Sequence, residues 1–158
     1  MGINRLCDGA WGSYLITTEN QDYLRAWIER ILFQKFGDEA KFIGQEKDGN
    51  LVAVVAFTNF IPNACAMHIA SVGEYWMDKN LLWACFDYPF NKLEKKVILA
   101  TMEASNEEAI KLNRHLGFQD KALIEDAHEN GDLLLMAMRK EDCKWLNLQC
   151  SLRKKLGD

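Results

Sequence analysis

Two side chains that can take up a proton lie in or beside predicted β-strands. Glu103 directly follows a strand predicted over residues 96–102, and His68 lies within a strand predicted over residues 64–71. The carboxyl end of a parallel strand is a common place for a ligand, so Glu103 is a candidate general base, acting directly or through water. The ordinary pKa of histidine also suits base chemistry. The competing interpretations are a solvated carboxylate for Glu103 and a core or cleft histidine for His68.

The other reactive side chains form no recognised catalytic or metal-binding pattern. The three histidines are scattered, and the five cysteines are an odd number with no CxxC pair. This distribution argues against a nucleophilic triad, a disulfide framework and a zinc site. We therefore expect no metal, and reduced thiols in a cytoplasmic protein.

The composition is typical of a folded domain. The 158 residues are 49% hydrophobic and 27% charged, enough for one domain with a sizeable core. We expect a single domain over residues 1–158, with a core at about residues 20–140 and a tail over residues 141–158. The net charge of −4 argues against a nucleic-acid partner. No apolar run reaches the roughly 20 residues of a membrane helix, and the N-terminus lacks a signal-peptide core.

Hydrophobic periodicity and turn residues predict the order of the elements. Residues 1–20 fit a short strand or an irregular segment. The apolar tail, Trp145 to Leu156, fits a helix that packs on the body or on a second copy in a homodimer. Between them we predict helices over residues 21–36 (stopping at Gly37), 79–88 and about 105–117, and strands over residues 41–46, 51–57, 64–71, 96–102, 118–126 and 132–140.

The connections between these elements predict the sheet. Asp48-Gly49 and Asn130-Gly131 are hairpin signals, which make the flanking strands antiparallel neighbours. The strand, helix and strand within residues 64–102 imply a right-handed crossover between parallel strands. The expected fold class is therefore α/β (α+β), a mixed, mostly antiparallel central sheet with helices on both faces.

One segment resembles a known family. Residues 105–118 include Asn106, Ala109 and the run Leu116-Gly117-Phe118. They resemble the Asn-x-x-Ala-hydrophobic-x-Leu-Tyr-x-x-x-Gly-Phe pattern of the GCN5-related N-acetyltransferases, the GNAT superfamily. With the element order, the resemblance covers about residues 40–140. The segments 68–71, 86–91 and 141–146 also look like a bacteriophage-encoded branch of that superfamily.

The resemblance implies an N-acetyltransferase that moves an acetyl group from acetyl-coenzyme A (acetyl-CoA) to an amine by direct attack. In such proteins the fourth strand and the next parallel strand splay apart, and backbone groups freed by the splay pair with the pantetheine amides. Here the backbone candidates are Ile69, Ala70 and Ser71. The alternative is an ordinary core strand without a ligand.

The resemblance is weakest in the loop that would hold the pyrophosphate. The family pattern Gln/Arg-x-x-Gly-x-Gly/Ala places phosphate on the N–H groups of a helix N-terminus. The matching positions here are Trp76, Met77, Asp78, Lys79, Asn80 and Leu81, and none of the expected types is present. Lys79 could supply charge, whereas Asp78 would oppose phosphate. A plain loop-to-helix cap is the competing interpretation.

The catalytic residues implied by the resemblance also depart from the family. Asn113 occupies the position where many members have a tyrosine that acts as the catalytic acid. Asn113 and Asn106 could instead hydrogen-bond the coenzyme. Ser71 could bind the cofactor or donate a proton to the leaving thiolate. Tyr75 and Trp76 could wall the cleft. Asp126 and His128 lie near the last hairpin, which in this family overhangs the acceptor site. They are interpreted as solvated turn residues, with contact to the acceptor as the alternative.

Three functions remain open from the sequence. The first is an N-acetyltransferase acting on a small-molecule or peptide amine. The second is a non-catalytic interaction protein of phage origin that kept the fold and lost or weakened its coenzyme chemistry. The third, an enzyme that modifies nucleic acid on the same scaffold, conflicts with the net charge of −4.

Overall fold

The computed structural model describes residues 8–9, 12–74 and 76–148. The elements, in chain order, are β1 (Asp8–Gly9), β2 (Gly12–Thr17), α1 (Gln21–Leu32), β3 (Lys41–Lys47), β4 (Asn50–Ile61), β5 (Ala64–Ser71), α2 (Lys79–Asp87), the π-helical turn η1 (Tyr88–Lys92), β6 (Val97–Glu103), α3 (Glu107–Leu116), β7 (Gln119–His128), β8 (Gly131–Arg139) and the short 3₁₀ helices η2 (Lys140–Asp142) and η3 (Lys144–Leu148). Among the described helices, none is long and apolar enough to cross a membrane.

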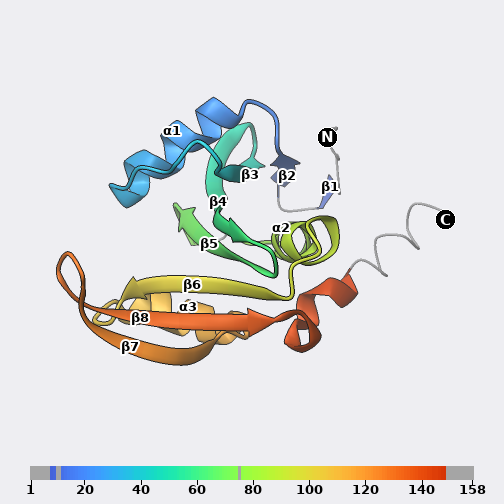
Figure 1. The fold of residues 1–158 in the computed structure, drawn as a ribbon. Helices are drawn as coiled ribbons and strands as arrows, with labels where there is room; N and C mark the ends of the chain where they lie inside the picture. Colours follow the sequence, from blue (N-terminus) through green and yellow to red (C-terminus); the bar gives the residue numbers. More distant parts are fainter. Residues whose placement is uncertain (1–7, 10–11, 75, 149–158) are drawn as a thin grey trace.

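The strands run side by side in the order β1-β2-β3-β4-β5-β6-β8-β7 (Figure 1). The pair β5–β6 is parallel, with α2 in the connection, and the other neighbouring strands are antiparallel. The expected mixed, mostly antiparallel sheet is confirmed, as are both predicted hairpins.

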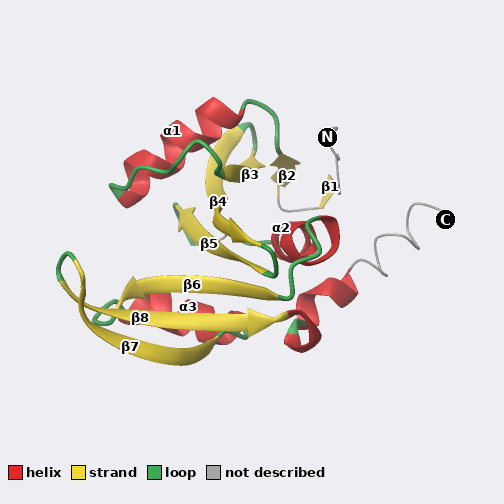
Figure 2. Cartoon of the chain, in the orientation of Figure 1, coloured by secondary structure: helices red, strands yellow, loops and turns green. Residues whose placement is uncertain are grey.

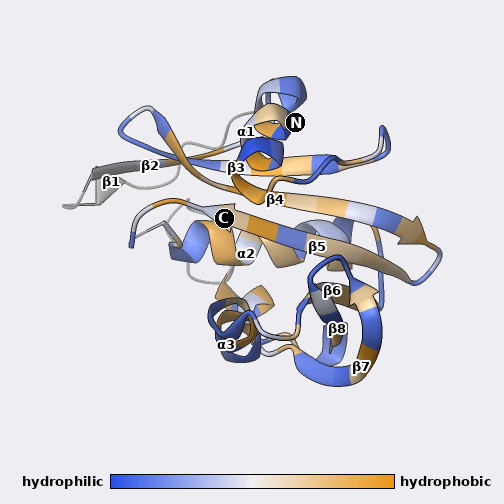
Figure 3. Ribbon diagram, turned by 90° about the vertical axis from the view of Figure 1, so that its left-hand side faces the viewer, coloured by the Kyte–Doolittle hydropathy of each residue, from blue (hydrophilic) through white to orange (hydrophobic). Residues whose placement is uncertain are grey.

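Helices cover both faces of the sheet (Figure 2), because the strands alternate apolar side chains between two clusters. On one face, α1 packs Leu24 and Ile28 against Phe42 and Val54. On the other face, α2 and α3 contribute Leu81, Phe86, Ile110 and Leu116 to a larger core with Val55, Phe57, Ile98 and Met136. Figure 3 shows the hydrophobic central strands lying between α1 and α2. This layering covers β5 from both sides and β6 from the side of α2 and α3.

The first helix is shorter than the periodicity predicts, so the predicted end at residue 36 is wrong. It ends at Leu32, and Phe33 caps it in the left-handed conformation at φ 52°. The following segment is tied back to the helix, because the Phe36 N–H donates to Glu29 Oε1 and Arg25 donates to the Phe36 carbonyl. Phe36 is therefore buried from a loop, at helical spacing but outside the helix.

In the part of the tail that the structure describes, the predicted helix is a short 3₁₀ helix that packs on the body, one of the two predicted alternatives. Residues 141–148 form the end of η2 and the turn η3. The Trp145 indole N–H donates to the Leu116 carbonyl over 2.7 Å, which fixes this segment to the end of α3. The remainder of the predicted tail, residues 149–158, lies outside the described residues, as do residues 1–7.

Gly44 permits the close approach of α1 to β3. A Cβ at this position would lie 2.6 Å from Leu24 Cδ2 and 3.1 Å from Leu51 Cδ2, and both leucines are buried. We expect Gly44→Ala to lower the free energy of unfolding by about 1–3 kcal/mol, because the added methyl overpacks this layer. Urea denaturation measures this loss. Alanine ordinarily stabilises a strand relative to glycine, so an unchanged or higher stability would contradict the packing described here.

Candidate functional site

The parallel strands β5 and β6 pair over only part of their length. Their ladder comprises Ala64–Val97, Cys65–Ile98 and Ala66–Leu99, and no residue after Ala66 is paired with β6. The two ribbons then diverge toward their carboxyl ends (Figure 1). The last five residues of β5 and the last four of β6 therefore border a gap within the sheet.

The backbone direction decides which groups of β5 face this gap. Val97 N–H donates to the Asn63 carbonyl, and Val72 N–H donates to the Val52 carbonyl of β4. Backbone groups alternate in direction along a strand, so odd-numbered residues of β5 face β6 and even-numbered ones face β4. Ile69 and Ser71 thus present N–H and C=O groups to the gap with no partner on β6. Ala70 presents its groups to β4.

The gap opens into a cavity of about 280 Å³ between β5, β6 and α3. The loop after α1 closes one side, and His128 at the end of β7 contributes another wall. The lining residues are Leu32, Gln34, Met67, His68, Ile69, Ala100, Thr101, Met102, Glu103, Asn106, Ala109, Leu112, Asn113 and His128.

The cavity connects the two faces of the sheet. Met67, Ala100 and Met102 belong to the core under α2 and α3. By the alternation of side chains, His68, Thr101 and Glu103 lie on the α1 face. A molecule that entered between the strands from the α3 side would therefore meet the two candidate bases on the opposite face.

His68 is a half-buried, neutral residue of the cavity wall. Its Nε2 shares a 3.2 Å hydrogen bond with Thr58 Oγ1, and its ring packs edge-on against Phe36 with 5.3 Å between centroids. Burial lowers the pKa of His68 below its ordinary value of 6.5, because desolvation disfavours the imidazolium. The ring is therefore able to accept a proton at neutral pH.

Glu103 ends β6 at the mouth of the cavity. The Ser105 hydroxyl donates to Glu103 Oε1 over 2.8 Å, which leaves Oε2 as an acceptor with no described partner. Across the cavity, His128 Nδ1 accepts the N–H of Asn130, so a neutral ring carries its proton on Nε2. The interpretation of His128 as a solvated turn residue is thus incomplete, because its side chain reaches the cavity.

Asn106 and Asn113 both line the cavity from α3, and both make helix contacts. The Asn106 side chain caps the helix by accepting the Ala109 N–H. Asn113 Nδ2 donates to the Ala109 carbonyl over 2.8 Å. The Oδ1 atom of Asn113 is therefore the part of that amide left for a ligand, and it can only accept hydrogen bonds.

The predicted phosphate loop is occupied with structural contacts. Asp78 is the N-cap of α2, and its Oδ1 accepts the Leu81 N–H over 2.8 Å. Leu81 and Asn80 are buried, whereas Trp76 and Met77 pack against the core. Buried Gln45 donates to the Trp76 carbonyl over 3.1 Å and holds the loop against β3. Lys79 is exposed at the helix start.

The structure gathers only part of the predicted site. His68, Ile69, Glu103, Asn106 and Asn113 line one cavity, whereas Ser71, Ala70 and residues 76–81 do not line it. Tyr75 lies outside the described residues. Residues not singled out from the sequence as site candidates also line the cavity, among them Gln34, Met67, Thr101 and Leu112. Only Thr101 carried a signal, as a polar residue on the same face of β6 as Glu103.

The described thiols are unsuited to nucleophilic chemistry. Cys65, Cys85 and Cys143 are free and buried. Burial raises the pKa of Cys65 to about 11, and it also raises the pKa of Cys85 and Cys143. Among the described residues, His, Cys, Asp and Glu side chains form no group of three that could hold a metal ion.

The sheet order, the divergent parallel pair and the helix layers are those of the N-acetyltransferase fold. Spermidine N-acetyltransferase SpeG from Vibrio cholerae (an N152L mutant) superposes with a TM-score of 0.66 at 15% identity, over 86% of this chain and 98% of that one. The acetyltransferase YncA from Salmonella typhimurium, solved with acetyl-CoA, gives 0.64 at 14% identity, over 80% and 93%. Ribosomal-protein-S5-alanine acetyltransferase from Vibrio fischeri gives 0.62 at 13% identity, over 83% and 95%.

The likeness lies in the fold, not in the sequence. No protein-family model and no curated protein matches the chain by sequence. At 13–15% identity the superpositions show a shared fold, and the fold expected from the GNAT resemblance is confirmed. Acceptor and catalysis have to be argued from the cavity itself.

The buried position of His68 gives the stability a pH dependence. Because its pKa is lowered on folding, the unfolded chain binds more protons below pH 6.5. Its contribution is fully present above pH 6.5 and is lost as the pH falls toward the folded pKa. We expect His68→Gln to lose less unfolding free energy than the wild type between pH 7 and pH 5. Urea denaturation at both values measures this, with exposed His115→Gln as the matched control. Equal losses in His68→Gln and the wild type would contradict a buried neutral His68.

Proposed function

We propose that this protein is an N-acetyltransferase that moves an acetyl group from acetyl-CoA to a primary amine by direct attack. The observation that carries the proposal is the end of the β5–β6 ladder after three residue pairs, beside a cavity that joins the two faces of the sheet. An uninterrupted ladder would leave no place for a thioester within the sheet.

The residues present fit a pantetheine arm. Ile69 and Ser71 offer backbone N–H and C=O groups that lack a partner on β6, and such groups at a cleft need hydrogen-bond partners. Amide groups of a pantetheine arm supply a donor and an acceptor of this kind. The apolar side chains of Met67, Ala109 and Leu112 would line its path. When bound, the coenzyme supplies the activated acetyl thioester.

Proton removal from the amine falls to the α1 face of the cavity. Glu103 Oε2 is an acceptor at the mouth, and neutral His68 lies deeper in the same cavity. Glu103 is the general base of this proposal, because its remaining oxygen is open to an ammonium or a bridging water. His68 is a second acceptor within the same wall.

Proton delivery to the leaving thiolate differs from the pattern of the family. Asn113 has no acidic proton, and its amide N–H already donates to the Ala109 carbonyl. Ser71 is half-buried at the end of β5 and lies outside the cavity lining. Its hydroxyl is proposed to donate to the thiolate from the edge of the gap that its backbone borders. A weaker donor than tyrosine would give slow turnover, with water as a competing proton source.

The acceptor in this proposal is a small amine or a peptide amine. The cavity lining contains the carboxylate of Glu103 and no lysine or arginine, which favours a positively charged ammonium over an anionic acceptor. Two of the structural neighbours are named for amine acceptors, spermidine and an alanine of ribosomal protein S5. Cytoplasmic location, phage origin and homodimer formation remain predictions from the sequence.

The second candidate is a fold relative without catalysis. It is favoured by Asp78, whose carboxylate occupies the helix N-terminus where the family places phosphate. Coenzyme binding separates the two candidates. Under the acetyltransferase proposal, acetyl-CoA raises the Tm with saturation at micromolar concentrations. Absence of any shift at millimolar acetyl-CoA would favour the non-catalytic protein.

Reversing the charge of Lys79 tests whether the start of α2 contributes to the binding of acetyl-CoA. We expect Lys79→Glu to raise the dissociation constant of acetyl-CoA by about three- to tenfold, because an exposed cation near phosphate becomes an anion. Calorimetric titration measures the constant. Lys121→Glu, on the exposed face of β7, is the control with the same charge change. Unchanged affinity in Lys79→Glu would place the pyrophosphate elsewhere.

The role of Glu103 is tested by removing its basicity while retaining its shape. We expect Glu103→Gln to lower kcat by about a hundredfold with little change in acetyl-CoA affinity, because an amide cannot take up the proton of the amine. Glu107→Gln, in the exposed first turn of α3, is the matched control. Full activity in Glu103→Gln would exclude Glu103 as the base.

A further inference from the structure

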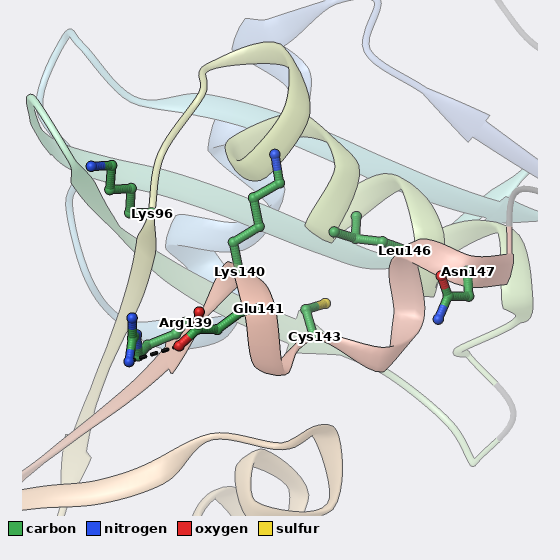
Figure 4. A pocket seen from close by; sticks show the side chains of 7 residues that line it. All are labelled: Lys96, Arg139, Lys140, Glu141, Cys143, Leu146 and Asn147. Carbon is green, nitrogen blue, oxygen red and sulfur yellow. Dashed lines mark ion pairs between the residues drawn. The ribbon is translucent and has the colours of Figure 1, made fainter.

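A second cavity, of about 570 Å³, lies where β6 begins and β8 ends. Lys96 borders it just before β6, and Arg139 and Lys140 border it at the end of β8 and the start of η2 (Figure 4). Cys143, Leu146 and Asn147 contribute from the segment that follows. Its volume falls within the range of small-molecule sites, roughly 300–1,000 Å³.

The wall of this cavity carries an excess of positive charge. Lys96, Arg139 and Lys140 face one carboxylate, Glu141, although the whole chain has a net charge of −4. Glu141 is engaged by Arg139 in a 2.7 Å ion pair. Within the described residues, neither Lys96 nor Lys140 makes an ion pair. Two ammonium groups therefore border the cavity without an anion from the described part of the chain.

The backbone under these side chains is fixed. Lys140 N–H donates to the Lys96 carbonyl over 2.9 Å, which joins the two lysine-bearing segments directly. Cys143 N–H donates to the Lys140 carbonyl, and Trp145 anchors η3 to the end of α3. A site whose backbone is already ordered loses less entropy when a ligand binds.

The cavity also offers contacts other than charge. Cys143 is buried and Leu146 is half-buried, so together they supply an apolar surface beside the cations. Burial raises the pKa of the Cys143 thiol, which is therefore neutral in this wall. The exposed Asn147 amide can both donate and accept. Charge on one side and an apolar surface on the other suit an organic anion.

The cationic cavity is separate from the acetyl-transfer site. Lys96 directly precedes β6 and Arg139 ends β8, whereas Glu103 is the last residue of β6. Lys96 and Glu103 are seven residues apart along extended chain, about 23 Å at roughly 3.3 Å per residue. The two cavities have no lining residue in common.

We propose that this cavity binds a small phosphorylated organic molecule. Its phosphate group contacts the Lys140 ammonium and the Arg139 guanidinium, and its organic part contacts Leu146 and Cys143. Lys96, whose side chain points away from Lys140 in Figure 4, turns toward the phosphate when the ligand binds. The three cations border one cavity and do not form a long stripe, so the site favours a compact ligand over a nucleic-acid strand.

The test is an ¹⁵N chemical-shift titration with inorganic pyrophosphate and with adenosine 5′-diphosphate, at low ionic strength. We expect the shifts to centre on Lys96 and residues 139–147. We expect the Lys96→Glu/Lys140→Glu variant to bind both probes about tenfold more weakly. Lys41→Glu/Lys121→Glu is a control with the same change in net charge. Acetyl-CoA affinity is expected to survive the Lys96/Lys140 change, so failure here is distinct from failure of the proposed function.

Three results would overturn the proposal. The first is no saturable shift at millimolar probe. The second is a result that points away from this cavity. Shifts confined to residues 67–71 and 100–113 would indicate binding in the coenzyme cleft, and equal weakening in the control variant would indicate nonspecific attraction by charge. The third is tighter binding of a short oligonucleotide than of adenosine 5′-diphosphate, with shifts extending beyond the cavity, which would indicate a nucleic-acid partner.

Discussion

The hydrogen-bond ladder between β5 and β6 stops after Ala66 and Leu99, and the arrangement of the candidate site follows from this. A parallel ladder that continued would satisfy Ile69 and Ser71 and would separate the two faces of the sheet. Because it stops, backbone groups face a cavity, and side chains from both faces reach it. Packing against helices stabilises the two strands where their ladder ends. Helix α1 buries the even-numbered side chains of β5, whereas α2 and α3 bury the side chains of β5 and β6 that face the larger core.

The sequence was sufficient for the elements whose cause is local. Asp48-Gly49 and Asn130-Gly131 specify their hairpins, and Asn106 with Gly117 specifies both ends of α3. The end of α1 has a tertiary cause instead. Phe33 adopts the left-handed conformation without being glycine and is 95% exposed, while Arg25 and Glu29 hold the next residues. The hydrophobic periodicity extends the predicted helix to Phe36, because Phe36 is buried and lies at helical spacing from the apolar residues of α1 although it belongs to the following loop.

Those residues of the candidate site could be predicted whose place in the site follows from their position along a strand. Glu103 and His68 could be identified from strand ends and residue types, because the carboxyl end of a parallel strand borders any gap that opens there. Gln34 could not be identified, since it reaches the cavity only because α1 ends early. Nor does the sequence indicate the cationic cavity: Lys96 and Lys140 are 44 positions apart, and only the pairing of β6 with β8 brings them together.

Asp78 links the fold to the question of coenzyme affinity. A helix N-terminus binds phosphate through free N–H groups, and a capping carboxylate removes one of these and adds a negative charge. In return, the cap stabilises α2, on which the core residues Leu81 and Phe86 depend. The loop of this chain therefore favours helix stability over anion binding. A coenzyme held here would depend more on the backbone of Ile69 and Ser71, and on Lys79, than on the helix N-terminus. Under the proposed function, that balance predicts a modest affinity for the coenzyme. It also explains why the phosphate pattern is unrecognisable in the sequence while the gap between the strands is retained.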